Sequence, residues 1–292
     1  MNAFTIKDLE NLSGIKAHTI RIWEQRYTFL KPRRTDTNIR YYSNDELKTI
    51  LNIALLNKYG YKISHINRMG PEEIRQRILS LNDTQAVQER IVTELVQEMV
   101  DLNMHCFEEI LDRYISINGI ERGVTQIIFP FLEKTGVLWL TGHINPAQEH
   151  LVSNVIRQKV IAAIETTNSH IQSEKTVMLF LPEGEHHELG LLFISYLLKS
   201  RGIRTVYLGA NVPFDDAAYV LDLKKPETVF VHLTACIPSF NFDKFLNNIK
   251  EKFTNSQVII SGSAIASYSK KIPPNVFLKS SLKEVVDFIR GL

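Results

Sequence analysis

The chain has 292 residues, of which 44% are apolar and 23% charged, and its formal net charge is +2. Its length exceeds the roughly 100 to 200 residues of one ordinary domain, so we expect two or three packed units, and its composition is that of a folded soluble protein. The first residues differ from a signal peptide, no apolar run approaches the roughly 20 residues of a membrane span, and the two cysteines support neither a disulfide framework nor a thiolate zinc site, so we expect a cytoplasmic protein.

The positive charge is concentrated at the N-terminus. Residues 1–70 contain 12 Lys and Arg against 6 Asp and Glu, a balance of +6, whereas residues 71–292 sum to −4. Clustered Lys and Arg bind phosphate-rich polymers, so this first quarter is expected to contact a polyanion. The alternative is a basic face that contacts only solvent.

The first 60 residues predict two short helices, a hairpin and a longer helix. Thr5 caps a helix through Leu12, Ser13-Gly14 turns the chain, and a second helix runs from about Lys16 to Arg26, which is a helix-turn-helix pattern. Residues 33–42, with an Asp- and Asn-containing middle between Arg and Tyr, predict a small hairpin, or wing. The capping box Ser43-Asn44-Asp45-Glu46 opens the next helix.

From Pro71 to about Ile171 the sequence is helical in pattern. Breaks are expected near Asn82-Asp83, Asn118-Gly119 and Thr141-Gly142, and Asn145-Pro146 is a strong helix start, so four or five helices fit in this region. They predict a helical bundle.

After residue 173 short apolar runs alternate with helical patterns. This alternation predicts right-handed crossovers and a parallel, doubly wound α/β sheet of the Rossmann-like or flavodoxin-like kind, whose ligands bind beyond the carboxyl ends of the strands. The predicted strands are Thr176–Leu181, Thr205–Leu208, Thr228–Leu233, Gln257–Ile260 and Asn275–Leu278. We therefore expect a multidomain protein with a winged helix-turn-helix domain at 1–72, a helical bundle at 73–172 and an α/β domain at 173–292.

The loop after the first strand, residues 182–190, lacks the Gly-x-Gly-x-x-Gly of a dinucleotide site. It presents imidazole and carboxylate instead, and an imidazole at this edge of the sheet can bind a metal. The alternative is a loop histidine exposed to solvent.

The string Glu185-x-His187-x-x-Gly190 resembles the cobalamin-binding signature of B12-binding Rossmann-like domains, in which the middle His replaces the cofactor's own benzimidazole on cobalt. The resemblance implies that His187 binds cobalt. It also implies that Glu185, where the family usually has Asp, accepts a hydrogen bond from the other ring nitrogen. Gly190 would leave room for the displaced nucleotide tail.

A second match to the same family is Tyr207–Pro213, which resembles the segment after its second strand. The Ser-x-Leu and Gly-Gly elements that line the family's tail pocket correspond to the less similar segments 231–234 and 261–263. The cofactor-binding residues implied in this domain are Glu185, His187, Gly190, Leu208, Gly209, Asn211, Val212, Leu233, Thr234, Ser261, Gly262 and Ser263.

In the helical region, Trp139 is followed after nine residues by Glu149-His150. Spacing alone favours a core Trp and a solvated pair. Together with the flanking domains, however, the arrangement resembles the B12-dependent photoreceptor repressors of the CarH/LitR group over nearly the whole chain. The resemblance implies that the bundle caps the upper face of the corrin, with Trp139, Glu149 and His150 in the upper pocket. Where the best-known light sensors have a second cobalt-binding His, this chain has Leu140, which has no donor atom.

Residues 18–27 and 31–34 resemble the winged head of the MerR family. The second helix would present its first turns to base edges and phosphates, and the wing arginines would meet backbone or minor groove. The implied DNA-binding residues are His18, Thr19, Arg21, Arg26, Arg33, Arg34 and Arg40. Ile20, Trp23 and Tyr42 are expected in the core of the head.

These resemblances imply a transcription regulator rather than an enzyme. The regulator is expected to be a repressor whose DNA binding is controlled by cobalamin. Adenosylcobalamin is the expected form, as a light-sensing chromophore that sets the oligomeric state, and methylcobalamin is the other candidate. Operator DNA and further copies of the chain, as a dimer or tetramer, are the expected partners. The alternatives are a light-independent cobalamin sensor, a corrinoid methyl carrier, and a regulator whose C-terminal part binds protein instead of cofactor.

Overall fold

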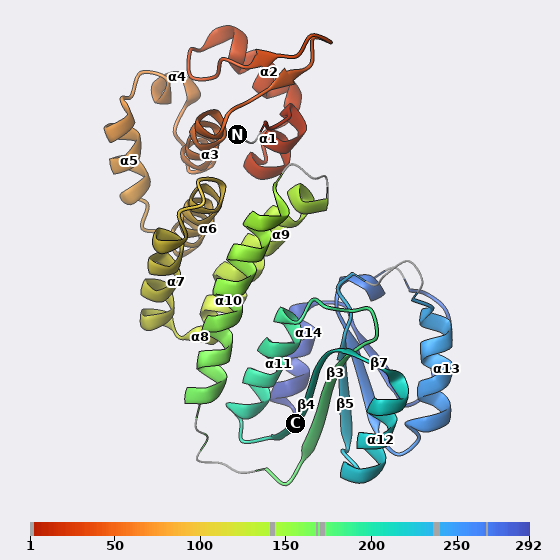
Figure 1. The fold of residues 1–292 in the computed structure, drawn as a ribbon. Coiled ribbons are helices and arrows are strands. Elements are labelled where there is room, and N and C mark those ends of the chain that lie inside the picture. Colours follow the sequence, from red (N-terminus) through yellow and green to blue (C-terminus); the bar gives the residue numbers. More distant parts are fainter. Residues whose placement is uncertain (1–2, 141–143, 168, 170–172, 236–239, 267) are drawn as a thin grey trace. The chain divides into compact units, whose positions relative to one another are not determined.

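The computed structural model describes residues 3–140, 144–167, 169, 173–235, 240–266 and 268–292, with the side chains of residues 137, 139 and 140 outside the description. The chain forms two compact units, Met1–Val155 and Ile156–Leu292 (Figure 1). No helix in the described ranges is both long enough and apolar enough to cross a membrane. The three-domain boundaries expected from the sequence stay a prediction.

The first unit begins with the predicted winged helix-turn-helix. Thr5 and Ser43 each form a reciprocal capping box, with Asp8 and Glu46 respectively, which confirms both predicted helix starts. Gly14 ends the first helix with a φ of 74°, a left-handed conformation that suits glycine. The elements are α1 (Ile6–Ser13), α2 (Ala17–Arg26), β1 (Arg33–Arg34), β2 (Arg40–Tyr41), α3 (Asn44–Lys58) and α4 (Ile63–Ile66).

The core of the head contains the side chains expected there. Ile20 and Tyr42 are fully buried and Trp23 nearly so. Phe4 is also fully buried, and its backbone forms an antiparallel bridge with Tyr42. Since Tyr42 directly follows β2, this bridge ties the wing to the start of the chain.

Within the described residues the helical region forms five continuous runs, in agreement with the four or five helices that the sequence predicts. The elements are α5 (Pro71–Leu79), α6 (Thr84–Val100), α7 (Met104–Asn118), α8 (Ile120–Gly123), the π-helical segment η1 (Val124–Ile128), α9 (Phe129–Leu140) and α10 (Pro146–Thr166). The break between α6 and α7 was not predicted, and there Leu102 takes a φ of 58°. The expected break at Thr141-Gly142 lies outside the described residues.

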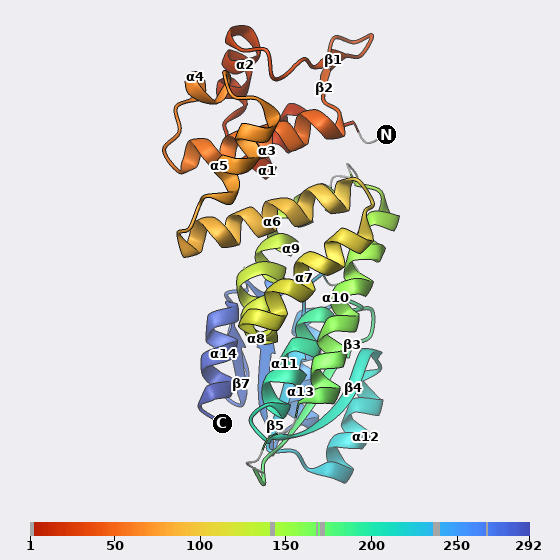
Figure 2. The ribbon, with the colours of Figure 1, turned by 90° about the vertical axis from the view of Figure 1, so that its left-hand side faces the viewer.

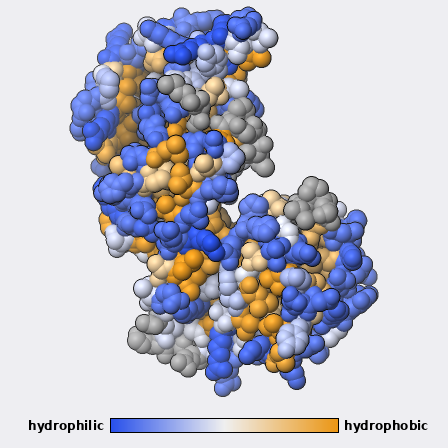
Figure 3. Space-filling view, in the orientation of Figure 1, coloured by the Kyte–Doolittle hydropathy of each residue, from blue (hydrophilic) through white to orange (hydrophobic). Residues whose placement is uncertain are grey.

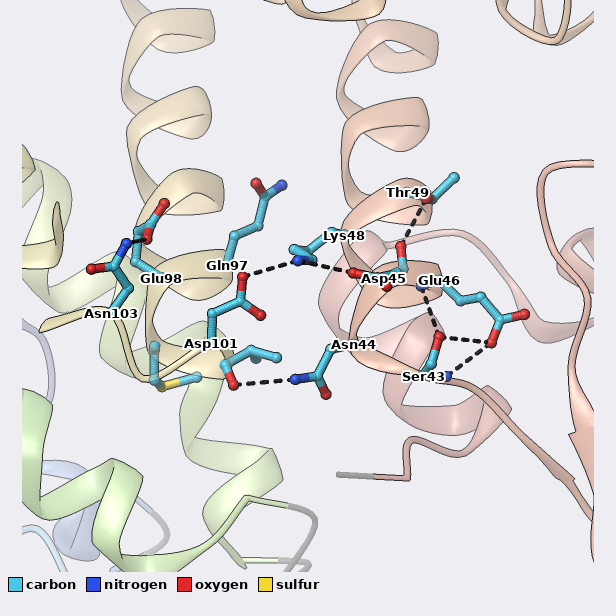
Figure 4. A network of polar contacts seen from close by, with 12 residues as sticks. Ser43, Asn44, Asp45, Glu46, Lys48, Thr49, Gln97, Glu98, Asp101 and Asn103 are labelled. Carbon is cyan, nitrogen blue, oxygen red and sulfur yellow. Dashed lines mark hydrogen bonds and ion pairs between the residues drawn. The ribbon is translucent and has the colours of Figure 1, made fainter. Parts of the chain in front are cut away.

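Helix α3 of the head contacts α6 through a polar network (Figure 4). Lys48 Nζ lies 2.9 Å from an Asp101 carboxylate oxygen and 3.0 Å from one of Asp45. Asn44 Nδ2 donates to the backbone carbonyl of Val100 at 3.3 Å. The same carbonyl and that of Met99 accept from Nε2 of Gln148, a buried side chain of α10. The C-terminal end of α6 therefore bonds to both the head and α10.

The second unit is the predicted parallel, doubly wound α/β fold. Five strands pair in the order β4-β3-β5-β6-β7, all parallel. Helices α11 and α14 contact each other on one face, and α12 and α13 contribute to the apolar core on the other (Figures 1 and 2). The strands are β3 (Thr176–Pro182), β4 (Arg204–Val212), β5 (Thr228–His232), β6 (Gln257–Ser261) and β7 (Val276–Lys279). The helices are α11 (Leu189–Lys199), α12 (Phe214–Lys224), α13 (Phe242–Lys252), the 3-10 turn η2 (Ser263–Ile265) and α14 (Leu282–Arg290).

This strand order has a switch point between β3 and β5. The chain leaves β3 for β4 on one side and then crosses back to β5 on the other. The loops after β3 and β5 therefore leave the sheet in opposite directions, and the crevice between them is where such folds bind ligands. All of the predicted strands are present, and β4 extends four residues beyond its predicted end at Leu208.

Candidate functional site

The loop between β3 and α11 presents His187 from the switch point. The His187 side chain is 56% exposed, whereas that of Glu185 is 1% exposed. A Glu185 carboxylate oxygen, Oε1, lies 2.6 Å from His187 Nδ1 and also accepts from the His187 backbone amide at 2.9 Å. The hydrogen bond between these two side chains that the sequence predicted is present.

The second oxygen of Glu185 reaches the loop after β5. Oε2 accepts from the backbone amides of Thr234 and Ala235, each at 2.9 Å. Burial by itself would raise the pKa of this carboxyl, but the hydrogen bonds from His187, Ala235 and Thr234 outweigh it and lower the pKa to about 2. One ionised, buried carboxylate thus joins the two loops that flank the switch point.

The carboxylate also fixes the tautomer of His187. Because ionised Glu185 can only accept, Nδ1 of the ring carries a hydrogen, and in the neutral ring Nε2 therefore carries the lone pair. An imidazole oriented in this way by a carboxylate is the usual arrangement of a metal-binding histidine. The donor set therefore fits a cobalt ion that His187 would hold through Nε2.

Residues of β4 fix the other side of the loop. Asn211, in a left-handed conformation with a φ of 57°, accepts from the Gly184 amide at 2.9 Å and donates its own amide to the Glu185 carbonyl at 3.1 Å. Tyr207 Oη donates to Glu188 at 2.8 Å, and Arg157 Nη2 lies 2.7 Å from the same carboxylate. Arg157 and Glu188 were not predicted, because their pairing depends on tertiary structure.

Several residues predicted to bind cofactor lie in or against the apolar core of the second unit. Leu233 is fully buried, Val212 is 9% exposed, and Leu208 packs against the same apolar cluster. Gly209 has a φ of 85°, and a Cβ added to it would lie 3.4 Å from Oε1 of Glu188.

The segment after β6 packs against the loop after β5. Ser263 Oγ donates to the Thr234 carbonyl at 2.8 Å. Gly262 has a φ of 110°, and a Cβ added to it would lie 2.1 Å from the Leu233 carbonyl oxygen. Ser261 is buried, and its hydroxyl lies 2.8 Å from Nδ1 of His232. These residues connect neighbouring strand ends.

The imidazole of His232 lies beside Gly190. A Cβ added to Gly190 would lie 2.3 Å from Nε2 of His232, so the imidazole of His232 already fills the space that the missing side chain leaves. The expectation of room for a nucleotide tail came from the glycine alone, and it stays a prediction beside the neighbouring ring of His232. His232 was also not predicted, although the reduced similarity of segment 231–234 was a signal.

The residues predicted for the upper pocket are only partly described. In α10, Glu149 accepts from Ser153 Oγ at 2.5 Å and lies 3.1 Å from Nδ1 of His150, whose side chain is 73% exposed. Trp139 and Leu140 belong to α9, but their side chains lie outside the described residues. The upper-pocket assignment stays a prediction.

Most of the residues predicted to bind DNA form an exposed set. His18, Arg21, Arg26, Arg33 and Arg34 are exposed and Thr19 is partly so, and the visible surface of the winged head, at the top of Figure 3, is mostly hydrophilic.

Arg40 differs from the other arginines of the wing. Its Nε lies 3.1 Å from a carboxylate oxygen of Glu24 in α2, and Tyr42 Oη donates to the same carboxylate. Burial and the bond to Glu24 raise the pKa of Tyr42. Arg40 thus fixes the wing against α2.

Comparisons with known families define the class of protein. Residues 4–72 match the MerR HTH family regulatory protein family, and residues 91–164 match the B12 binding domain family. The second match begins within α6, ends near the end of α10 and does not include the sheet. The chain thus joins a MerR-type DNA-binding head to a B12-binding domain, and the cofactor class is cobalamin.

Two relatives from Myxococcus xanthus are similar to nearly the whole chain. The HTH-type transcriptional repressor CarH is 24% identical over 90% of this chain and 89% of its own length, and the HTH-type transcriptional repressor CarA is 26% identical over 91% and 89%. The chain has the domain composition of a CarH-type regulator. The monomethylamine corrinoid protein of Methanosarcina barkeri, 14% identical with a TM-score of 0.57, covers 70% of this chain with its full length and shares the fold.

Proposed function

We propose that this protein is a DNA-binding repressor controlled by bound cobalamin. The observation that carries the proposal is the imidazole of His187, exposed at the switch point and oriented by the buried carboxylate of Glu185. The similarity to two transcriptional repressors supports a regulatory role, without catalysis.

His187 would hold the cobalt of the cofactor. When bound, the cofactor would supply a cobalt–carbon bond that light can break, and we propose adenosylcobalamin as the form used. Glu185 keeps the ring in the tautomer that cobalt requires, and its bonds to Thr234 and Ala235 fix the loop to the next strand end. Asn211 fixes the opposite side of the loop through Gly184.

Control of DNA binding would come from assembly. One small head with a few phosphate contacts binds weakly at physiological salt. Heads linked in a dimer or tetramer bind together with a high effective concentration, and this gain disappears when the linkage is lost. We propose that adenosylcobalamin favours the assembled, DNA-binding form.

The test is a mobility-shift assay on DNA from the protein's own promoter region, with the chain loaded with adenosylcobalamin in the dark. The loaded chain is expected to shift the DNA as an oligomer, and the cofactor-free chain is expected to bind far more weakly. A corrinoid methyl carrier would shift no DNA, and a chain that does not take up the cofactor would contradict cobalamin control.

Leu140 favours a second candidate, a light-independent cobalamin sensor. Leucine has no donor atom, so this position cannot supply a second ligand to cobalt after the upper group is lost. The same assay after green light separates the two functions. Loss of the DNA complex together with the adenosyl spectrum supports a photoreceptor, and an unchanged complex supports the light-independent sensor.

Replacing Arg33 and Arg34 together with alanine should weaken DNA binding and reduce its salt dependence. Both side chains are exposed on β1 of the wing. If each contacts one phosphate, the slope of log K against log salt should become shallower by about 2. Titrations of one DNA fragment at several salt concentrations measure this, with Arg204→Ala, an exposed arginine of the second unit, as the control. An unchanged slope would remove the wing from the DNA interface.

A further inference from the structure

The contact between Gly190 and His232 bears on which corrinoids this chain accepts, and its interpretation rests on the proposed cobalamin binding. Gly190 lies in the first turn of α11, directly after the His187 loop. A Cβ there would lie 2.3 Å from Nε2, 2.5 Å from Cδ2 and 2.8 Å from Cε1 of His232. These distances place the edge of the imidazole against the glycine backbone. The space between α11 and β5 that the glycine leaves is the Gly190 notch, and His232 fills it.

The His232 ring is fixed by the sheet itself. His232 is the last residue of β5 and pairs in parallel register with Ser261, the last residue of β6. Its Nδ1 lies 2.8 Å from the Ser261 hydroxyl, which is buried. The ring is therefore positioned by backbone pairing and by a hydrogen bond at its far nitrogen, while its other edge contacts Gly190.

The ring is also uncharged at neutral pH. Burial lowers the pKa of His232 to about 4, and the effect of burial exceeds that of the Glu185 carboxylate, which acts to raise the pKa. A neutral imidazole can stay buried in the Gly190 notch, because it does not carry the desolvation cost of a buried charge.

A cobalamin bound through His187 would need a place for its own lower base. With His187 holding the cobalt, the base at the end of the nucleotide tail would be displaced from the metal. The Gly190 notch lies beside the His187 loop and is the position where an absent side chain would leave space for that base. Here the imidazole of His232 takes that space.

We propose that His232 determines the corrinoid specificity of this chain by keeping the nucleotide base out of the Gly190 notch. The protein then recognises the corrin ring and the cobalt and gains little from the tail. The ligand class is corrinoids as a group, including those without a nucleotide tail, such as cobinamides.

The experiment compares adenosylcobalamin with adenosylcobinamide, which lacks the nucleotide tail, on the full chain in the dark. Dissociation constants are measured by absorbance titration for the wild type, for His232→Ser and for His186→Ser. His186 is an exposed histidine of the same loop, so its replacement removes an imidazole without opening the notch. His232→Asn is a second variant that keeps a polar group near Ser261, and circular dichroism checks the folding of each.

The wild type and His186→Ser are expected to bind the two corrinoids with constants within about threefold of each other. His232→Ser should prefer adenosylcobalamin by about tenfold or more, because the opened notch can bury an aromatic base. A wild type that prefers adenosylcobalamin tenfold overturns the proposal and leaves cobalamin binding intact, whether or not the variants fold. A wild type that binds neither corrinoid overturns the proposed function as well.

Discussion

A His187→Ala variant is expected to bind cobalamin about 10- to 100-fold more weakly than the wild type and to lose cofactor control of DNA binding. In other metal sites, removal of a group that only orients a metal ligand already lowers the metal affinity by about 10- to 100-fold. His187 would itself be the ligand, and its ring nitrogen is oriented by Glu185 at 2.6 Å. Alanine leaves no donor atom at the position.

The cobalt signal tests the ligand directly. In the reduced, paramagnetic Co(II) form, an axial nitrogen splits each cobalt line of the electron paramagnetic resonance spectrum, into triplets for ¹⁴N and doublets for ¹⁵N. Protein labelled with ¹⁵N-histidine should give doublets in the wild type and in His186→Ala, which removes the neighbouring exposed histidine. His187→Ala should lose them. Doublets that persist in His187→Ala, or triplets in the labelled wild type, would show that His187 is not the ligand.

The second large effect is structural. Gly262→Ala should lower the free energy of unfolding of the second unit by about 3 kcal/mol or more. The φ of Gly262 is 110°, and an added Cβ would lie 2.1 Å from the Leu233 carbonyl oxygen and 2.6 Å from its carbon. Both clashing atoms are backbone atoms of the strand-end segment that also bonds to Glu185, so relief requires that segment to move.

Chemical denaturation followed by circular dichroism measures the effect, with Gly291→Ala as the matched control. At Gly291 the φ is −87° and the nearest atom to an added Cβ is 3.4 Å away, so its substitution should change the unfolding free energy little. Equal midpoints for the two variants would contradict the strain argued for Gly262. A weaker cobalamin affinity in Gly262→Ala is a further expected result, because the Thr234 amide that bonds to Glu185 would shift.

Local signals in the sequence predicted most of the elements. The capping boxes at Thr5 and Ser43, Pro71 at a helix start and the apolar strands all act through neighbours within a few residues. The break after Val100 carries no glycine or proline, and the left-handed conformation of Leu102 has no cue at that residue. The available signal was Asn103, whose side chain caps α7 by accepting from the Cys106 amide.

The site was predicted where its chemistry is local and missed where it is not. Glu185 and His187 are two residues apart, and the resemblance to the cobalamin-binding signature implied the hydrogen bond that the structure shows between them. The amides of Thr234 and Ala235 reach Glu185 only because β3 and β5 are neighbours in the sheet. The same adjacency brings His232 against Gly190, and no pattern within either segment indicates it.

The shared end of α6 limits how this protein can be cut and recombined. The side chains of Asn44 and Lys48 in the head bond to Val100 and Asp101, more than 40 residues beyond the wing. Transplanting residues 1–72 onto a different sensor would leave Asn44 and Lys48 without these hydrogen-bond partners. A graft that carries the chain through Asp101 would transfer the head with its own docking partner, and would be the natural unit for building new switches.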